Sequence, residues 1–153
     1  MAPDNTHYLT KDGLGRLQEE LQKLRTERMR LVRELENGDE GRDELGVVEK
    51  RIDDISQVLR SYDLIKLPPK HARDIIQLGA TVLLKNDLGH TSELTILGTL
   101  DADPRLGRIS NESPVGRALL GHKAGDVILV HMNTKVLYTV EKVRYGGTLT
   151  KKV

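Results

Sequence analysis

The residues best suited to chemistry are six carboxylates crowded into positions 34–44 of the 153-residue chain. The only base among them is Arg42, so this segment has a net charge of −5. Clustered carboxylates repel one another unless a cation relieves them, and hard divalent cations such as Mg²⁺ favour oxygen ligands. Two interpretations fit this pattern. The carboxylates are ligands for a metal ion that is held elsewhere, or they form an ordinary solvated turn. The acids are Glu34, Glu36, Asp39, Glu40, Asp43 and Glu44.

No self-contained catalytic site accompanies these acids. The five histidines are scattered without metal-ligand spacing, and the sequence contains no EF-hand and no phosphate-binding glycine loop. The absence of cysteine excludes disulfides, thiolate metal sites and cysteine nucleophiles. Phe and Trp are also absent, which disfavours a base-stacking nucleic-acid platform. The sequence therefore indicates no active site of its own.

Two runs of apolar residues flank the acidic segment at alternating steps of three and four. This spacing is typical of a coiled-coil seam, and Asn37-Gly38 with Gly41 breaks the helix between the runs. We predict an antiparallel helical hairpin with its tip at residues 36–44, built from helices of about 20–25 residues that span roughly 30–38 Å. The seams are Leu14, Leu17, Leu21, Leu24, Leu31 and Leu35, with Arg28 between them, and Leu45, Val48, Ile52, Ile55, Leu59 and Tyr62.

A basic run precedes the tip on the first predicted helix. It consists of Arg25, Arg28, Arg30 and Arg33. Arg28 occupies a seam position, where its stem packs along apolar surface or its charge pairs with an acid on the second helix. The alternative that stays open is contact of these side chains with RNA or protein.

The second half of the chain has the pattern of a small α+β domain. Strands are predicted at 80–84, 92–97, 126–131 and 135–144, and Ser113-Pro114 is typical of a helix start. We expect a twisted antiparallel sheet with one short helix over 114–120. Pro68-Pro69 cannot continue a helix and indicates a boundary. The predicted organisation is a hairpin over 8–67, a linker over 68–77 and a second domain over 78–146.

One segment resembles a known family. Residues 110–126, Ser-Asn-Glu-Ser-Pro-Val-Gly-Arg-Ala-Leu-Leu-Gly-His-Lys-Ala-Gly-Asp, are similar to the C-terminal signature of the GreA/GreB family of bacterial transcription elongation factors. Residues 9–13 and 78–82 and the pair Gly38-Asp39 also resemble that family. The resemblance implies an N-terminal antiparallel coiled coil and a C-terminal domain similar to FK506-binding proteins.

The resemblance also implies a function on another enzyme. The C-terminal domain would dock on the rim of the RNA polymerase secondary channel through Glu112, Ser113 and Pro114. The tip acids Asp39, Glu40, Asp43 and Glu44 would act in trans, with Asp39, Glu40 and Asp43 sharing the polymerase's Mg²⁺ during cleavage of the nascent RNA 3′ end. No cofactor of its own, no membrane and no second copy are implied, so the expectation is a cytoplasmic monomer.

Two departures from the family pattern leave the activity open. Family members that stimulate cleavage carry Gly-Asp-x-x-Glu-Asn, whereas this chain has Arg42 and Asp43 at the last two positions. The coil is also shorter than is usual for the family by about a heptad on each helix, roughly 10 Å of reach. The expected function is stimulation of transcript cleavage; the alternative is a paralogue that occupies the channel and regulates or inhibits the polymerase. A peptidyl-prolyl isomerase, weakened by the scarcity of aromatics, and a structural coiled-coil adaptor are further alternatives.

Overall fold

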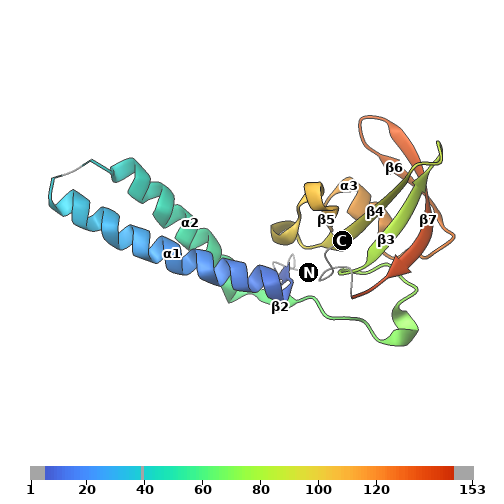
Figure 1. Ribbon diagram of the computed structural model, residues 1–153, viewed down its shortest axis with the longest axis horizontal. Helices are drawn as coiled ribbons and strands as arrows, with labels where there is room; N and C mark the ends of the chain where they lie inside the picture. The colour runs from blue at the N-terminus through green and yellow to red at the C-terminus, as the bar shows by residue number, and fades with distance from the viewer. Residues whose placement is uncertain (1–5, 39, 147–153) are drawn as a thin grey trace, which may run out of the picture. The chain divides into compact units, whose positions relative to one another are not determined.

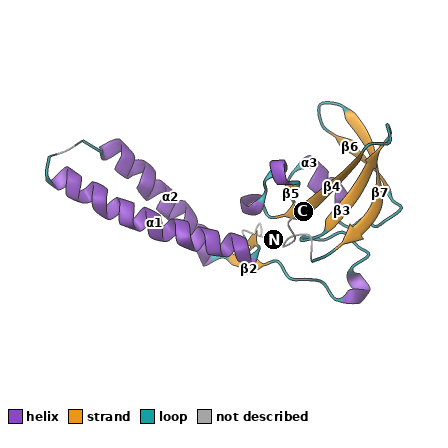
Figure 2. Cartoon of the chain, in the orientation of Figure 1, coloured by secondary structure: helices purple, strands orange, loops and turns teal. Residues whose placement is uncertain are grey.

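The computed structural model describes residues 6–38 and 40–146. The chain divides into two compact units, one formed chiefly by Lys11–Asp63 and the other by Leu64–Val153 together with Tyr8–Thr10. The first unit is helical and the second is built around a sheet, as the secondary-structure colours of Figure 2 show. The predicted α+β class with a helical hairpin is confirmed. Within the described residues, no helix is both long and apolar enough to cross a membrane.

The first unit is a hairpin of α1 (Lys11–Glu36) and α2 (Arg42–Arg60), which run side by side in Figure 1. The buried faces carry Leu17, Leu21 and Leu31 on α1 and Ile52, Ile55 and Val58 on α2. Most of the stability of such helices comes from tertiary packing, so burying the two seams against each other stabilises both. The end of the second predicted seam is different: α2 stops at Arg60, and Tyr62 begins the short strand β2 (Tyr62–Leu64).

An ion pair across the hairpin sets the two helices in register. The Arg51 guanidinium donates to both carboxylate oxygens of Glu20, from Nε at 2.6 Å and from Nη2 at 3.0 Å. The hydrogen bond from Arg51 lowers the pKa of Glu20, and the same contact raises the pKa of Arg51. Both side chains are about 40% exposed, so solvent screens the pair. The pair therefore contributes to the choice of register more than to stability.

The second unit contains a five-stranded sheet in the order β5-β4-β3-β7-β6. Its strands are β3 (Thr81–Asn86), β4 (Thr91–Leu97), β5 (Arg108–Ser110), β6 (Val127–His131) and β7 (Lys135–Arg144). The sheet is mixed, because β5 pairs parallel with β4, whereas we predicted an antiparallel sheet. A three-residue strand such as β5 is too short to show the alternation on which the prediction depended. The three-residue strands β1 (His7–Leu9) and β2 form a separate two-stranded sheet.

The short helix α3 (Pro114–Leu119) packs against one face of the five-stranded sheet, close to β6. Its Leu119 joins a core of Val82, Leu84, Ile96 and Val130. Ile76, which lies in the segment predicted as a linker, is also buried in this core. Its N–H donates to the His122 carbonyl at 2.8 Å, and its carbonyl accepts from Gly121 N–H at 2.9 Å. The segment before β3 is therefore tied to the end of α3.

Candidate functional site

The tip of the hairpin is a short turn between two helices. Helix α1 ends at Glu36, and backbone hydrogen bonds from Asn37 and Gly38 to the last carbonyls of α1 close the turn. Gly38 has a φ of 86°, a left-handed conformation that glycine adopts without steric cost. Helix α2 then starts at Arg42. Asp39, one of the predicted tip acids, lies outside the described residues.

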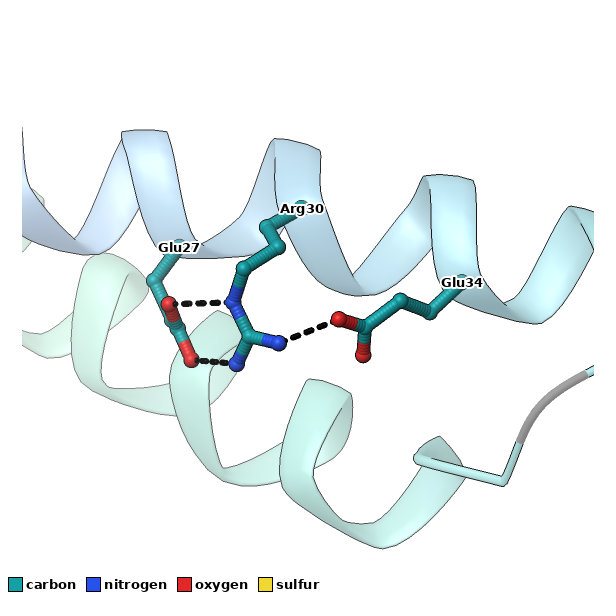
Figure 3. Close-up of polar contacts among 3 residues, drawn as sticks. All are labelled: Glu27, Arg30 and Glu34. Carbon is teal, nitrogen blue, oxygen red and sulfur yellow. Dashed lines mark hydrogen bonds and ion pairs between the residues drawn. The ribbon is translucent and has the colours of Figure 1, made fainter.

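One of the six acids is already engaged within its own helix. Arg30 bonds to both Glu27 and Glu34, one turn before it and one turn after it, as Figure 3 shows. The hydrogen bond to Glu27 and then that to Glu34 raise the pKa of Arg30, and Arg30 in turn lowers the pKa of Glu27. Glu34 is thus held along α1. Of the basic run, Arg30 thus pairs within its own helix. Among the described residues, no ion pair joins Arg28 to an acid of the second helix, which was the predicted pairing.

The remaining described acids of the tip are exposed. Asp43 and Glu44 lie in the first turn of α2, where negative charge is stabilised by the positive end of the helix dipole. Gly41 precedes the helix and has no side chain to cap it. Glu40 lies on the other side of Gly41, and these residues surround a shallow hollow that Leu35 and Arg42 also line.

The tip can offer oxygen ligands, but it does not assemble a metal site by itself. In residues 6–38 and 40–146, no three His, Asp or Glu side chains come together as a group that could hold a metal ion. Glu40, Asp43 and Glu44 are all exposed, and the exposed Arg42 lies among them. The arrangement suits carboxylates that complete a site on another molecule, with one positive charge opposing that role.

The second predicted site is the loop that connects β5 to α3. Ser113 is the N-cap of α3: its Oγ accepts from Gly116 N–H at 3.1 Å and donates to the Ser110 carbonyl at 2.6 Å. Pro114 follows at the first helical position. Of the three residues predicted to dock, Glu112 and Pro114 are exposed, while Ser113 is half-buried and its hydroxyl holds the loop together. The loop therefore presents a carboxylate beside a rigid apolar ring.

Sequence reasoning missed the residue that holds Glu112. The Thr99 hydroxyl donates to Glu112 Oε2 at 3.0 Å and lies 2.8 Å from Ser110 Oγ. Thr99 belongs to the short 3-10 helix Thr99–Asp101 and lies outside the signature, 11 residues before Ser110. No motif points to Thr99, because only the parallel pairing of β4 with β5 brings it next to the loop.

The last residue of the signature, Asp126, closes the turn after α3. Its Oδ2 accepts from Lys123 N–H at 3.1 Å and lies 3.0 Å from His122 Nδ1. The backbone hydrogen bond from Lys123, followed by the contact with His122, lowers the pKa of Asp126 below its ordinary value of 3.8. This acid has a structural role that explains its place in the pattern.

We expect Asp126→Asn to destabilise the second unit in a pH-dependent way. Because the pKa is lower in the folded than in the unfolded chain, the ionised carboxylate stabilises the fold above 3.8, and this contribution is lost as the pH falls through the folded pKa. In urea unfolding, the free energy of unfolding should therefore be higher for wild type than for the variant near about pH 7, and this difference should disappear in acid. Asp87→Asn, at an exposed turn, is the matched control. A gap that does not change with pH would contradict the assignment.

Comparison with known proteins places this architecture in a family. Residues 70–145 match the family described as "Transcription elongation factor, GreA/GreB, C-term". The transcription elongation factor GreA of Thermomicrobium roseum is 38% identical over 133 positions, covering 78% of this chain and 85% of the relative. GreA of Halalkalibacterium halodurans is 35% identical over 156 positions, covering 90% and 98%. Among solved structures, the GreA factor homologue Gfh1 of Thermus thermophilus is 26% identical, with 92% and 99% coverage and a TM-score of 0.43.

The alignment with the T. roseum protein also shows a difference in length. It spans 133 positions but uses 78% of this 153-residue chain, which is about 119 residues. About 14 of the aligned positions therefore have no residue of this chain. The match to the family and the sequence identity to these relatives lead to the same conclusion: this protein belongs to the GreA/GreB family of transcription elongation factors.

Proposed function

We propose that the protein docks on RNA polymerase at the rim of the secondary channel and stimulates the polymerase to cleave backtracked RNA. The observation that carries this proposal is the exposed set of carboxylates at the end of the hairpin, Glu40, Asp43 and Glu44. Within the described residues, none of these carboxylates is used in an ion pair or hydrogen bond. Family membership supports the polymerase as the partner.

The proposed chemistry belongs to the polymerase. Mg²⁺ ions of its active site supply Lewis acidity and an activated water for phosphodiester hydrolysis when bound there. Glu40 and Asp43, together with Asp39, would contribute oxygen ligands to that site, and Glu44 would add negative charge beside it. We expect the factor alone to need no cofactor and to cleave no RNA. We propose that it is a cytoplasmic monomer. Its contacts with the polymerase would be made by Glu112, Ser113 and Pro114.

A second candidate function is regulation of the polymerase without cleavage. Two observations favour it. Arg42 places a positive charge among the tip acids, which disfavours binding of a cation. About 14 aligned positions lack a residue of this chain, which equals one heptad for each helix. A coil shorter by one heptad on each helix would lose roughly 10 Å of reach. In this case the hairpin would occupy the channel and hinder substrate entry or RNA backtracking.

The deciding experiment uses a backtracked elongation complex with Mg²⁺. Under the proposed function, the protein shortens the RNA, and changing Asp39, Glu40, Asp43 and Glu44 together to Ala abolishes shortening while affinity for polymerase changes by less than about 2-fold. The matched control removes exposed acids away from the tip, Glu19→Ala with Glu49→Ala.

Each outcome of this experiment separates the candidates. No shortening by a protein that still competes with a known cleavage factor would support the regulator. Loss of polymerase affinity in the tip variant would mean that the tip docks rather than acts. Failure to bind polymerase at all would overturn both functions.

A further inference from the structure

The Glu112 side chain is part of a closed ring of hydrogen bonds. Its backbone N–H donates to Ser110 Oγ at 3.0 Å, the Ser110 and Thr99 hydroxyls lie 2.8 Å apart, and Thr99 Oγ donates to Glu112 Oε2 at 3.0 Å. Since the Thr99 proton goes to the carboxylate, the Ser110 hydroxyl is the donor to Thr99. Each hydroxyl donates once and accepts once, so the ring leads from the amide of Glu112 to its own carboxylate.

This ring restricts a side chain that is otherwise exposed. An exposed glutamate normally samples several rotamers, and ordering it on binding costs free energy. Hydrogen bonds in such chains polarise and strengthen one another. The ring engages Oε2 alone: within the part of the chain that the structure describes, Oε1 has no hydrogen-bond or ion-pair partner. The carboxylate is thus anchored by one oxygen and open at the other.

Exposed apolar residues lie near Glu112 and Thr99 in the sequence, which suits a basic partner group with an apolar stem. Pro114 is exposed two residues along the loop, and Leu100, next to Thr99, is 43% exposed. Arginine and lysine combine a charged end with an aliphatic stem that packs on apolar surface. A carboxylate held in place gives a charge-assisted hydrogen bond with little loss of side-chain freedom.

We propose that Thr99 is a positioning residue that holds the Glu112 carboxylate ready for one arginine or lysine side chain of the polymerase. This inference rests on the proposed docking role of Glu112 and deepens it, because it names the chemistry of the partner group and the residue that orients its acceptor. Ser110 completes the positioning by linking the amide of Glu112 to Thr99.

The test measures the affinity of the full-length protein for core RNA polymerase. We expect Glu112→Gln to weaken binding by about 10-fold or more and to reduce its salt dependence. Thr99→Val, which keeps the shape but removes the hydroxyl, should weaken binding about 3- to 10-fold, and Thr99→Ser should restore it. Ser110→Ala should resemble Thr99→Val. The control is Thr91→Val, at an exposed position of β4.

The double variant Thr99→Val with Glu112→Gln decides between positioning and direct contact. If Thr99 acts through Glu112, the double variant binds no more weakly than Glu112→Gln alone. Additive losses of affinity in the double variant would overturn the inference. So would a Thr99→Val variant that binds as tightly as the Thr91→Val control while Glu112→Gln binds weakly. Either result leaves the docking role of Glu112 intact. A Glu112→Gln variant with unchanged affinity would instead refute the docking assignment itself. Melting temperatures close to wild type exclude unfolding as the cause of any loss.

Discussion

Gly116→Ala is expected to destabilise the second unit by about 3 kcal/mol or more, because the added methyl has no space. A Cβ at this position would lie 2.1 Å from the Ser110 carbonyl oxygen, 3.1 Å from its carbon and 3.1 Å from Ser113 Oγ. That carbonyl oxygen already accepts from the N–H and the hydroxyl of Ser113, so moving it would break the N-cap of α3. The loop that carries Glu112 would be displaced with it. We therefore expect polymerase binding to fall together with stability.

Thermal unfolding measures this effect directly. For a unit of this size, about 3 kcal/mol corresponds to a fall in melting temperature of roughly 12 °C or more. Gly15→Ala and Gly46→Ala are matched controls, because both glycines lie in helices and a Cβ there meets nothing within 4 Å. They should raise stability slightly, since alanine favours a helix. A melting temperature of Gly116→Ala within a few degrees of wild type would contradict this prediction. It would mean that the loop can shift to make room for the added methyl.

Arg42→Glu is expected to increase transcript cleavage by about 10-fold or more, which is about 1.4 kcal/mol of transition-state stabilisation. The change replaces the one positive charge among the tip acids by a carboxylate at the position where the family pattern has Glu. It leaves the hairpin intact, because an acid at the first position of α2 is favourable at the positive end of the helix. The rate of RNA shortening in backtracked complexes gives the measurement.

Arg25→Glu is the control for this experiment, since it makes the same change of charge at an exposed position of α1 away from the tip. Equal rates for the two variants would mean that the charge of Arg42 does not limit cleavage. If neither variant shortens RNA although both bind polymerase, the reach of the hairpin is the limit, and the regulatory function is supported.

The hairpin and most strands could be predicted from the sequence because their signals are local. Steps of three and four place Leu17, Leu21 and Leu31 on one helix face wherever the helix lies. Strand β7 has the predicted limits, Lys135–Arg144, since its Val, Tyr and Thr residues favour a strand. The Ser113-Pro114 start of α3 is likewise a local signal, because the N-cap bond spans three residues.

The candidate site was only partly predictable. The acidic character of the tip is a matter of composition, but the sequence alone did not show that Arg30 engages Glu34 while Asp43 and Glu44 stay exposed. Arg28 occupies a seam position, yet the ion pair observed between the two described helices joins Arg51 to Glu20. Which charges meet across a hairpin depends on the register of the two helices, and here that register joins two residues that are 31 positions apart in the chain.

By itself the sequence determined the two-part organisation, the acidic tip, the family signature and the absence of thiol chemistry. Only the tertiary structure decided that β5 lies parallel to β4, that Thr99 meets Glu112, and that the carbonyl of Ser110 leaves Gly116 no room for a side chain. The physical reason is how far apart the interacting residues lie along the chain. Periodicity and capping act over three or four residues and can be seen in the order of the chain, whereas these contacts arise when packing of the core brings distant segments together.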